Sequence, residues 1–176
     1  NSSFFFLKTH YLTSVNFNIP INLYFLLETL TASFKIFIAL LISFSVKIIL
    51  NEFSVITFFL TFVLMFFYII FCLGILKILS ILTFLSKDIS LAVRYFSIGL
   101  IVISPISYTM LMIPDKLQVL IFLNPLSYFL FSFQSLVIFN EIPSKELIFG
   151  VAVLSMTTYL VGSLFYNFSI KKIRVF

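Results

Sequence analysis

The chain has 176 residues, of which 62% are hydrophobic and only 10% carry a charge. An ordinary soluble domain has about 25% charged residues, so these charges are too few to cover the surface of a water-soluble fold. The composition therefore excludes a soluble globular protein and predicts an integral membrane protein, whose apolar surface is covered by lipid.

The rest of the composition excludes several kinds of site. Cys72 is the only cysteine and His10 the only histidine, so neither an intrachain disulfide nor a metal site is expected. The four Gly form no phosphate-binding loop, and we do not expect this chain to bind ATP itself. No nucleophile–base pair indicates catalysis, so the sequence predicts neither an enzyme nor a cofactor. The 11 basic residues are scattered, which argues against nucleic acid as a partner.

The predicted elements are all helices, because lipid offers no partners for unpaired backbone groups. Apolar runs of about 20 residues can cross a bilayer. The chain starts at Asn1 with no signal-peptide pattern, and we interpret it as a fragment of a longer protein. The runs predict one transmembrane domain with this order: inner segment 1–22, span 23–46, span 53–76, inner loop 77–94, span 95–113, outer segment 114–146, span 147–170 and inner tail 171–176.

The uncharged stretch Leu117–Asn140 decides on which side of the membrane the C-terminus lies. If it does not cross, seven basic residues fall on the inner side and three on the outer side; if it crosses, the count is five against five. Membranes select the asymmetric arrangement. We therefore predict about four spans, a cytoplasmic C-terminus and an outer re-entrant helical hairpin broken near Asn124-Pro125. The stretch is interrupted by polar or helix-breaking residues at Gln118, Asn124, Pro125, Gln134 and Asn140.

Four short motifs follow one another through the second half of the chain: Ser86-Lys87-Asp88-Ile89, Ser104-Pro105-Ile106-Ser107-Tyr108, Ile113-Pro114 and Leu123-Asn124-Pro125-Leu126-Ser127-Tyr128. Their order and spacing resemble those of the ABC-2 type transporter permeases that export O-antigen, capsular polysaccharide or teichoic acid. The stretch that ends in Phe17-Asn18-Ile19-Pro20 is similar to the loop before the third span of that family. The resemblance covers nearly the whole chain, as the C-terminal two-thirds of a six-span permease. Two departures are Lys87 and Gln134, at positions where the family usually or often has Arg.

The resemblance implies a permease subunit of an ATP-driven exporter in the bacterial plasma (inner) membrane, moving a lipid-linked polysaccharide or a similar polymer. The implied partners are a cytoplasmic ATP-binding subunit, a second copy of the permease as a homodimer, membrane lipid and the lipid-linked glycan. The inner loop is the candidate for coupling to the ATPase, and the loop ending at Pro20 is implied as a second contact. An ordinary basic loop is the alternative. The coupling residues are Lys87, Asp88, Ile89, Arg94, Phe17 and Pro20.

The candidate translocation path contains Ser104, Pro105, Tyr108, Asn124, Pro125 and Tyr128. Pro105 lacks a backbone N–H and predicts a kink at mid-span, where Ser104 can satisfy freed backbone groups. We expect Asn124 to cap the second limb of the hairpin, with Pro125 at its first helical position. Tyr128 could stack on a sugar ring. The alternatives are packing for Pro105, capping alone for Asn124, and an interfacial position for each Tyr.

Glu28 and Lys35 are two helical turns apart and lie on one face of the first predicted span. Charges inside a membrane are unfavourable and usually have a function. Glu28 is also near enough to the inner interface to extend toward water, and Lys35 can pair with it or with another helix.

Two other functions remain open. A membrane-arm subunit of a respiratory complex encoded in an AT-rich organelle would have a similar composition. Such proton-handling subunits place several ionisable residues at mid-span, and the later predicted spans lack them. A non-catalytic membrane scaffold is excluded by no feature of the sequence. The 26 Phe are attributed to AT-rich coding bias.

Overall fold

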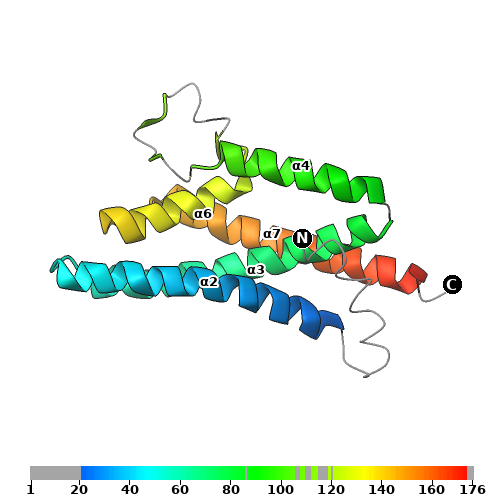
Figure 1. Cartoon of the computed structure of the whole chain (residues 1–176), viewed down its shortest axis with the longest axis horizontal. Helices are drawn as coiled ribbons and strands as arrows, with labels where there is room; N and C mark the ends of the chain where they lie inside the picture. Colours follow the sequence, from blue (N-terminus) through cyan, green and yellow to red (C-terminus); the bar gives the residue numbers. More distant parts are fainter. Residues whose placement is uncertain are drawn as a thin grey trace. The chain divides into compact units, whose positions relative to one another are not determined.

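The computed structural model describes residues 21–85, 87–105, 108–109, 112–114, 119 and 121–173 (Figure 1). These residues contain helices and no strand, so the predicted all-helical class is confirmed. The elements are α2 (Ile21–Ile49), α3 (Val55–Leu85), α4 (Lys87–Ile103), α6 (Pro125–Gln134), the π-helix η2 (Ser135–Phe139) and α7 (Lys145–Ile173).

Three of these helices are long and apolar enough to cross a membrane. The stretches are Asn22–Ile49 of α2, Val55–Leu82 of α3 and Lys145–Ser169 of α7, with 28, 28 and 25 residues. Each exceeds the roughly 20 helical residues that a bilayer requires. The apolar parts of the shorter helices are Leu91–Ile101 and Pro125–Phe139. The three long helices support membrane insertion, while a fourth span and a re-entrant hairpin stay predictions.

The third predicted span, 95–113, differs from the helix observed there. α4 begins at Lys87 and ends at Ile103, and Ser104 and Pro105 lie outside it. The expected kink at mid-helix is therefore wrong: proline lacks a donor and disfavours helical geometry in the residue before it, and here the helix ends. Residues 77–85 belong to α3 and residues 87–94 to α4, so most of the predicted inner loop 77–94 is helical.

The turn between α2 and α3 is closed by a Schellman motif. Asn51 has a positive φ of 59°, and its N–H donates to the carbonyl of Ile48. The N–H of Glu52 donates to the carbonyl of Lys47 at 2.9 Å. These two bonds satisfy carbonyls that the helix end leaves open, and Asn tolerates the left-handed conformation that they require.

The chain divides into two compact units. Unit 1 contains Asn1–Ser33, Ile69–Phe96 and Ser155–Phe176, and unit 2 contains Phe34–Tyr68 and Ser97–Leu154. In unit 1, Phe25 of α2, Ile81 of α3 and Tyr166 of α7 form a buried cluster, with the rings of Phe25 and Tyr166 edge to face at 5.2 Å.

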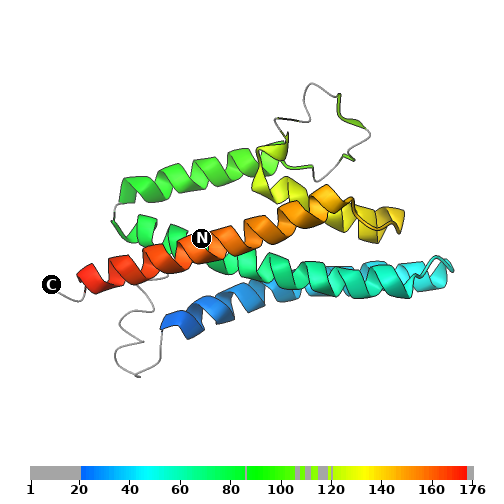
Figure 2. The same ribbon diagram turned by 180° about the vertical axis from the view of Figure 1, so that it is seen from behind.

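The described residues of unit 2 pack through apolar side chains in different places. One region joins α2 and α3 through phenylalanine rings, such as Phe44 against Phe58 at 5.1 Å between ring centroids. In Figures 1 and 2 these parts of α2 and α3 lie side by side. Another region is a buried cluster of Ile113, Ile121, Phe131 and Leu147. Several of the 26 Phe thus have a packing role that the sequence alone does not indicate.

Candidate functional site

The start of α6 has the predicted cap. Asn124 is the N-cap residue, and its side-chain oxygen accepts from the N–H of Leu126 at 3.0 Å. Pro125 follows at the start of the helix, where its missing N–H leaves no intrahelical bond unmade. The predicted helix cap at Asn124-Pro125 is confirmed, while the re-entrant hairpin and the place of these residues in a translocation path stay predictions.

The same Asn124 side chain joins α6 to the end of α4. Its Nδ2 donates to the carbonyl of Leu100 at 3.0 Å and to Oγ of Ser104 at 2.9 Å. The Ser104 hydroxyl itself donates to the carbonyl of Leu100 at 2.8 Å. Asn124 and Ser104 are both buried. The two motif segments that contain Ser104-Pro105 and Asn124-Pro125 are therefore in direct contact. We call this hydrogen-bonded contact the motif junction.

Gln134, at the end of α6, reaches the chain just after α4. Its Nε2 donates to the carbonyls of Pro105 and Tyr108 at 2.8 and 3.1 Å. These carbonyls lie outside any helix, so the amide supplies a partner that regular structure does not. Among the residues that the structure describes, the buried Oε1 of Gln134 and the buried Oγ of Ser127 have no hydrogen-bond partner.

Asn140, directly after η2, joins three further segments. Its Oδ1 accepts from Oγ1 of Thr57 at 2.8 Å and from Nζ of Lys47 at 3.4 Å. Its Nδ2 donates to the carbonyl of Glu52 at 3.1 Å. Asn140 has a φ of 61°, and its backbone N–H closes the π-helix on the carbonyl of Ser135. One side chain thus ties the end of η2 to α2, to the α2–α3 turn and to α3.

Lys47 is buried with only a few per cent of its surface exposed, although the sequence places it in an outer turn. Its Nζ also donates to the carbonyl of Leu136 at 3.4 Å, within η2. π-helical turns release carbonyls from regular pairing and often occur at functional sites. Together, Asn124, Gln134, Asn140 and Lys47 hold the α6–η2 segment at both ends.

The two candidate tyrosines of the path have structural partners. The hydroxyl of Tyr108 donates to the carbonyl of Ile103 at 2.8 Å. The ring of Tyr128 lies against Gly150 of α7, where an added Cβ would be 2.5 Å from a ring carbon. The centroid of the Tyr128 ring is 5.3 Å from that of the Phe122 ring. Tyr128 is half-buried in the apolar cluster of unit 2. Packing is therefore an observed role of this ring, whereas sugar stacking stays a prediction.

The candidate coupling residues lie in unit 1 or outside the described residues. Lys87 and Asp88 open α4, Ile89 is half-buried and Arg94 is exposed. Phe17 and Pro20 lie outside the described residues. Both intramembrane candidates are in α2, where Glu28 is half-buried and Lys35 is exposed.

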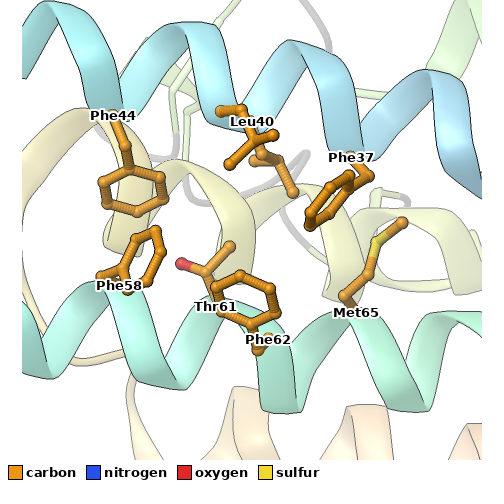
Figure 3. Close-up of a pocket in the computed structure, with 8 residues that line it drawn as sticks. Phe37, Leu40, Phe44, Phe58, Thr61, Phe62 and Met65 are labelled. Atoms are coloured by element: carbon orange, nitrogen blue, oxygen red, sulfur yellow. The ribbon is translucent and has the colours of Figure 1, made fainter.

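A shallow apolar groove lies between α2 and α3 in unit 2 (Figure 3). The space between its side chains is about 240 Å³, including the part that is open to the surroundings, and Thr61 is the only lining residue with a hydroxyl. That hydroxyl donates to the carbonyl of Thr57 at 2.7 Å and is not available to a ligand as a donor. Among the described residues, no three His, Cys, Asp or Glu side chains gather as metal ligands would.

Comparisons with protein-family models, with curated proteins and with solved structures find no match for this chain.

Proposed function

We propose that the chain is the membrane-embedded permease subunit of an ATP-driven exporter that moves a lipid-linked polysaccharide or a similar polymer. The observation that carries the proposal is the motif junction, in which Asn124 donates to Ser104 and to the carbonyl of Leu100. The motifs that underlie the family resemblance are thus hydrogen-bonded neighbours, as expected if they build one functional element.

The chemistry of the junction suits a transport path. Irregular backbone at membrane depth is tolerated only where it is packed in protein or faces a water-filled cavity. Pro105 and Tyr108 have such backbone, and Gln134 donates to both of their carbonyls. Asn124 donates to the carbonyl of Leu100 and to Ser104 at the end of α4. The Oε1 of Gln134 and the Oγ of Ser127 are buried without a partner among the described residues, and we expect them to meet water or a sugar hydroxyl only when this segment rearranges during transport.

The proposed arrangement keeps four spans, an outer re-entrant limb formed by α6 and η2, and a cytoplasmic C-terminus. Two copies would form the path in a bacterial plasma membrane, each with an ATP-binding partner. The coupling contact would involve Lys87, Asp88, Ile89 and Arg94 of α4, together with Phe17 and Pro20. Arg94 supports this role because it is exposed.

The test uses inside-out vesicles of the source membrane that contain the full-length permease and its ATP-binding partner. Export is measured as ATP-dependent uptake of the lipid-linked glycan into these vesicles. Asn124→Ala should lower the rate about tenfold or more, because two buried hydrogen bonds and a cap are lost. Asn167→Ala is the matched control, since Asn167 is exposed on α7. Equal rates for both variants at equal membrane levels, or no ATP-dependent uptake by the wild type, would contradict the proposal.

One observation favours the second candidate, a proton-handling subunit of a respiratory complex. Lys47 and Lys77 are buried within helices long enough to span a membrane, contrary to the positions that the sequence suggests for them. Ionisable residues buried at membrane depth are typical of proton relays. Lys77 has no carboxylate partner among the described residues, whereas the ammonium of Lys47 interacts with the carboxylate of Glu52. Loss of respiration-driven acidification on Lys77→Met, with glycan export absent from the wild type, would select this function.

A further inference from the structure

Lys77 has an unusual environment in unit 1. It is the only Lys, Arg, Asp or Glu in α3, and only 7% of its surface is exposed. Its Nζ donates to Oγ of Ser163 on α7 at 3.0 Å and lies 4.7 Å from the ring centroid of Tyr159. A hydroxyl and an aromatic face stabilise an ammonium, but neither neutralises it.

The position of this ammonium is fixed by a close crossing of α3 and α7. A Cβ added to Gly74, one turn before Lys77, would lie 2.5 Å from the carbonyl carbon of Thr158. A Cβ added to Gly162, next to Ser163, would collide with the carbonyl of Gly74. The two backbones therefore touch, which brings Lys77 of α3 close to Ser163 of α7.

No acidic side chain of the described part of the chain forms an ion pair with Lys77. A buried charge without a counter-charge is strongly unfavourable, and proteins normally supply one. The ammonium has three N–H groups, and one hydrogen bond to Ser163 leaves donors for another acceptor. The hydroxyl hydrogen of Ser163 is also free to donate, since its oxygen accepts from Lys77. The missing partner is thus an anion with several acceptor oxygens.

The location points to the source of that anion. Lys77 lies five residues before the end of the candidate span of α3, and Ser163 six before the end of that of α7. At 1.5 Å per residue both are within about 9 Å of the span ends, a distance that a lysine side chain and a lipid headgroup can bridge together. The described residues of unit 1 also include five basic and two acidic residues, which attract anionic lipid.

We propose that Lys77 and Ser163, with Tyr159 beside them, bind the phosphate group of an anionic membrane phospholipid. The ammonium and the serine hydroxyl would donate to phosphate oxygens, and the exposed Tyr159 could offer its hydroxyl as a third donor. Free inorganic phosphate could accept the same hydrogen bonds, and the experiment distinguishes it from a phospholipid. The site requires only that α3 and α7 lie in a membrane, so it does not depend on the exporter proposal.

The test uses the full chain in nanodiscs of equal parts phosphatidylglycerol and phosphatidylcholine, with the retained lipids identified by native mass spectrometry. The wild type should retain phosphatidylglycerol preferentially. Lys77→Gln should reduce that preference about tenfold, Ser163→Ala should reduce it less, and Lys77→Arg should keep most of it. Lys145→Gln is the matched control, because Lys145 is an exposed lysine of α7 in unit 2. Circular dichroism and gel filtration confirm that each variant is folded.

The outcomes separate the possibilities. Equal retention of the two lipids by the wild type, or equal effects of Lys77→Gln and Lys145→Gln, would overturn the site. If Lys77→Gln does not fold, the comparison of Ser163→Ala with Lys145→Gln takes its place with the same criteria. Millimolar inorganic phosphate should leave the bound phosphatidylglycerol in place. Its displacement would assign the site to free anions and contradict a lipid ligand.

Discussion

The two units hold their helices together in different ways. In unit 1, α3 and α7 meet backbone to backbone at Gly74 and Gly162. In unit 2, the α6–η2 segment is held by the side-chain amides of Asn124, Gln134 and Asn140. Close backbone packing tolerates no added atom, whereas hydrogen bonds between side chains can break and form again. We therefore expect an added atom at the crossing in unit 1 to destabilise the fold more than the loss of a single amide in unit 2.

Charge follows the same division. Among the described residues, unit 1 has five basic and two acidic side chains and unit 2 has three of each. An excess of basic residues is typical of the cytoplasmic side of membrane proteins. The basic residues of unit 1 are Lys77, Lys87, Arg94, Lys171 and Lys172, the same residues from which the cytoplasmic orientation is predicted.

The largest expected effect is on the backbone crossing of unit 1. Gly74→Ala should lower the free energy of unfolding by about 2–3 kcal/mol, because its Cβ would meet main-chain atoms of Thr158, which cannot move without the helix. The measurement is unfolding by SDS in mild detergent, followed by far-UV circular dichroism. Gly99→Ala is the control: nothing lies within 4 Å of its added Cβ, so a helical Ala should gain up to about 1 kcal/mol.

A double variant sharpens this prediction. The Cβ added at Gly162 collides with Gly74 itself, so both substitutions separate the same pair of helices. Gly74→Ala with Gly162→Ala should therefore destabilise by clearly less than the sum of the single effects. Additive effects, or a Gly74→Ala variant as stable as the Gly99→Ala control, would show that α3 and α7 do not cross here.

The next effect is on the amide that ties η2 to α2 and α3. Asn140→Gly keeps the positive φ but removes the bonds to Thr57, Glu52 and Lys47, so the free energy of unfolding should fall by about 1–2 kcal/mol. Asn51→Gly is a matched control, because Asn51 is exposed and has nearly the same φ, 59°. It should change stability by less than about 0.5 kcal/mol. A similar loss in both variants would mean that backbone geometry alone matters at Asn140.

The sequence predicts local features of unit 2 better than distant ones. The helical class and the Asn124-Pro125 cap follow from composition and from neighbouring residues, and both are confirmed. Gln134 and Asn140 are recognised in the sequence only as polar interruptions, because their partners are distant in the chain. Asn140 and Lys47 are 93 residues apart, and Gln134 and Pro105 are 29 apart. A single sequence contains no signal for such pairs.

The positions of the lysines show a second limit. Counting uncharged runs ends a span at the nearest charge, and so places Lys47 and Lys77 in loops. In the structure both helices continue through these residues, since each ammonium finds partners on another helix: Asn140 and Leu136 for Lys47, and Ser163 and Tyr159 for Lys77. Tertiary partners of this kind allow a charge inside a helix that hydropathy alone would end.

The smallest expected effect concerns the unpartnered hydroxyl of unit 2. Ser127 is fully buried and its Oγ has no partner, which is unfavourable for a hydroxyl removed from water. If another group of the protein formed a hydrogen bond with the Ser127 hydroxyl, Ser127→Ala would be destabilising. If the hydroxyl instead binds a polar ligand in the path, Ser127→Ala should raise the free energy of unfolding by up to about 1 kcal/mol and lower glycan export.

Ser132→Ala is the control, because the Ser132 hydroxyl already donates to the carbonyl of Tyr128 at 2.7 Å. A more stable Ser127→Ala variant with unchanged export would show that the buried hydroxyl is unfavourable for folding but has no role in transport.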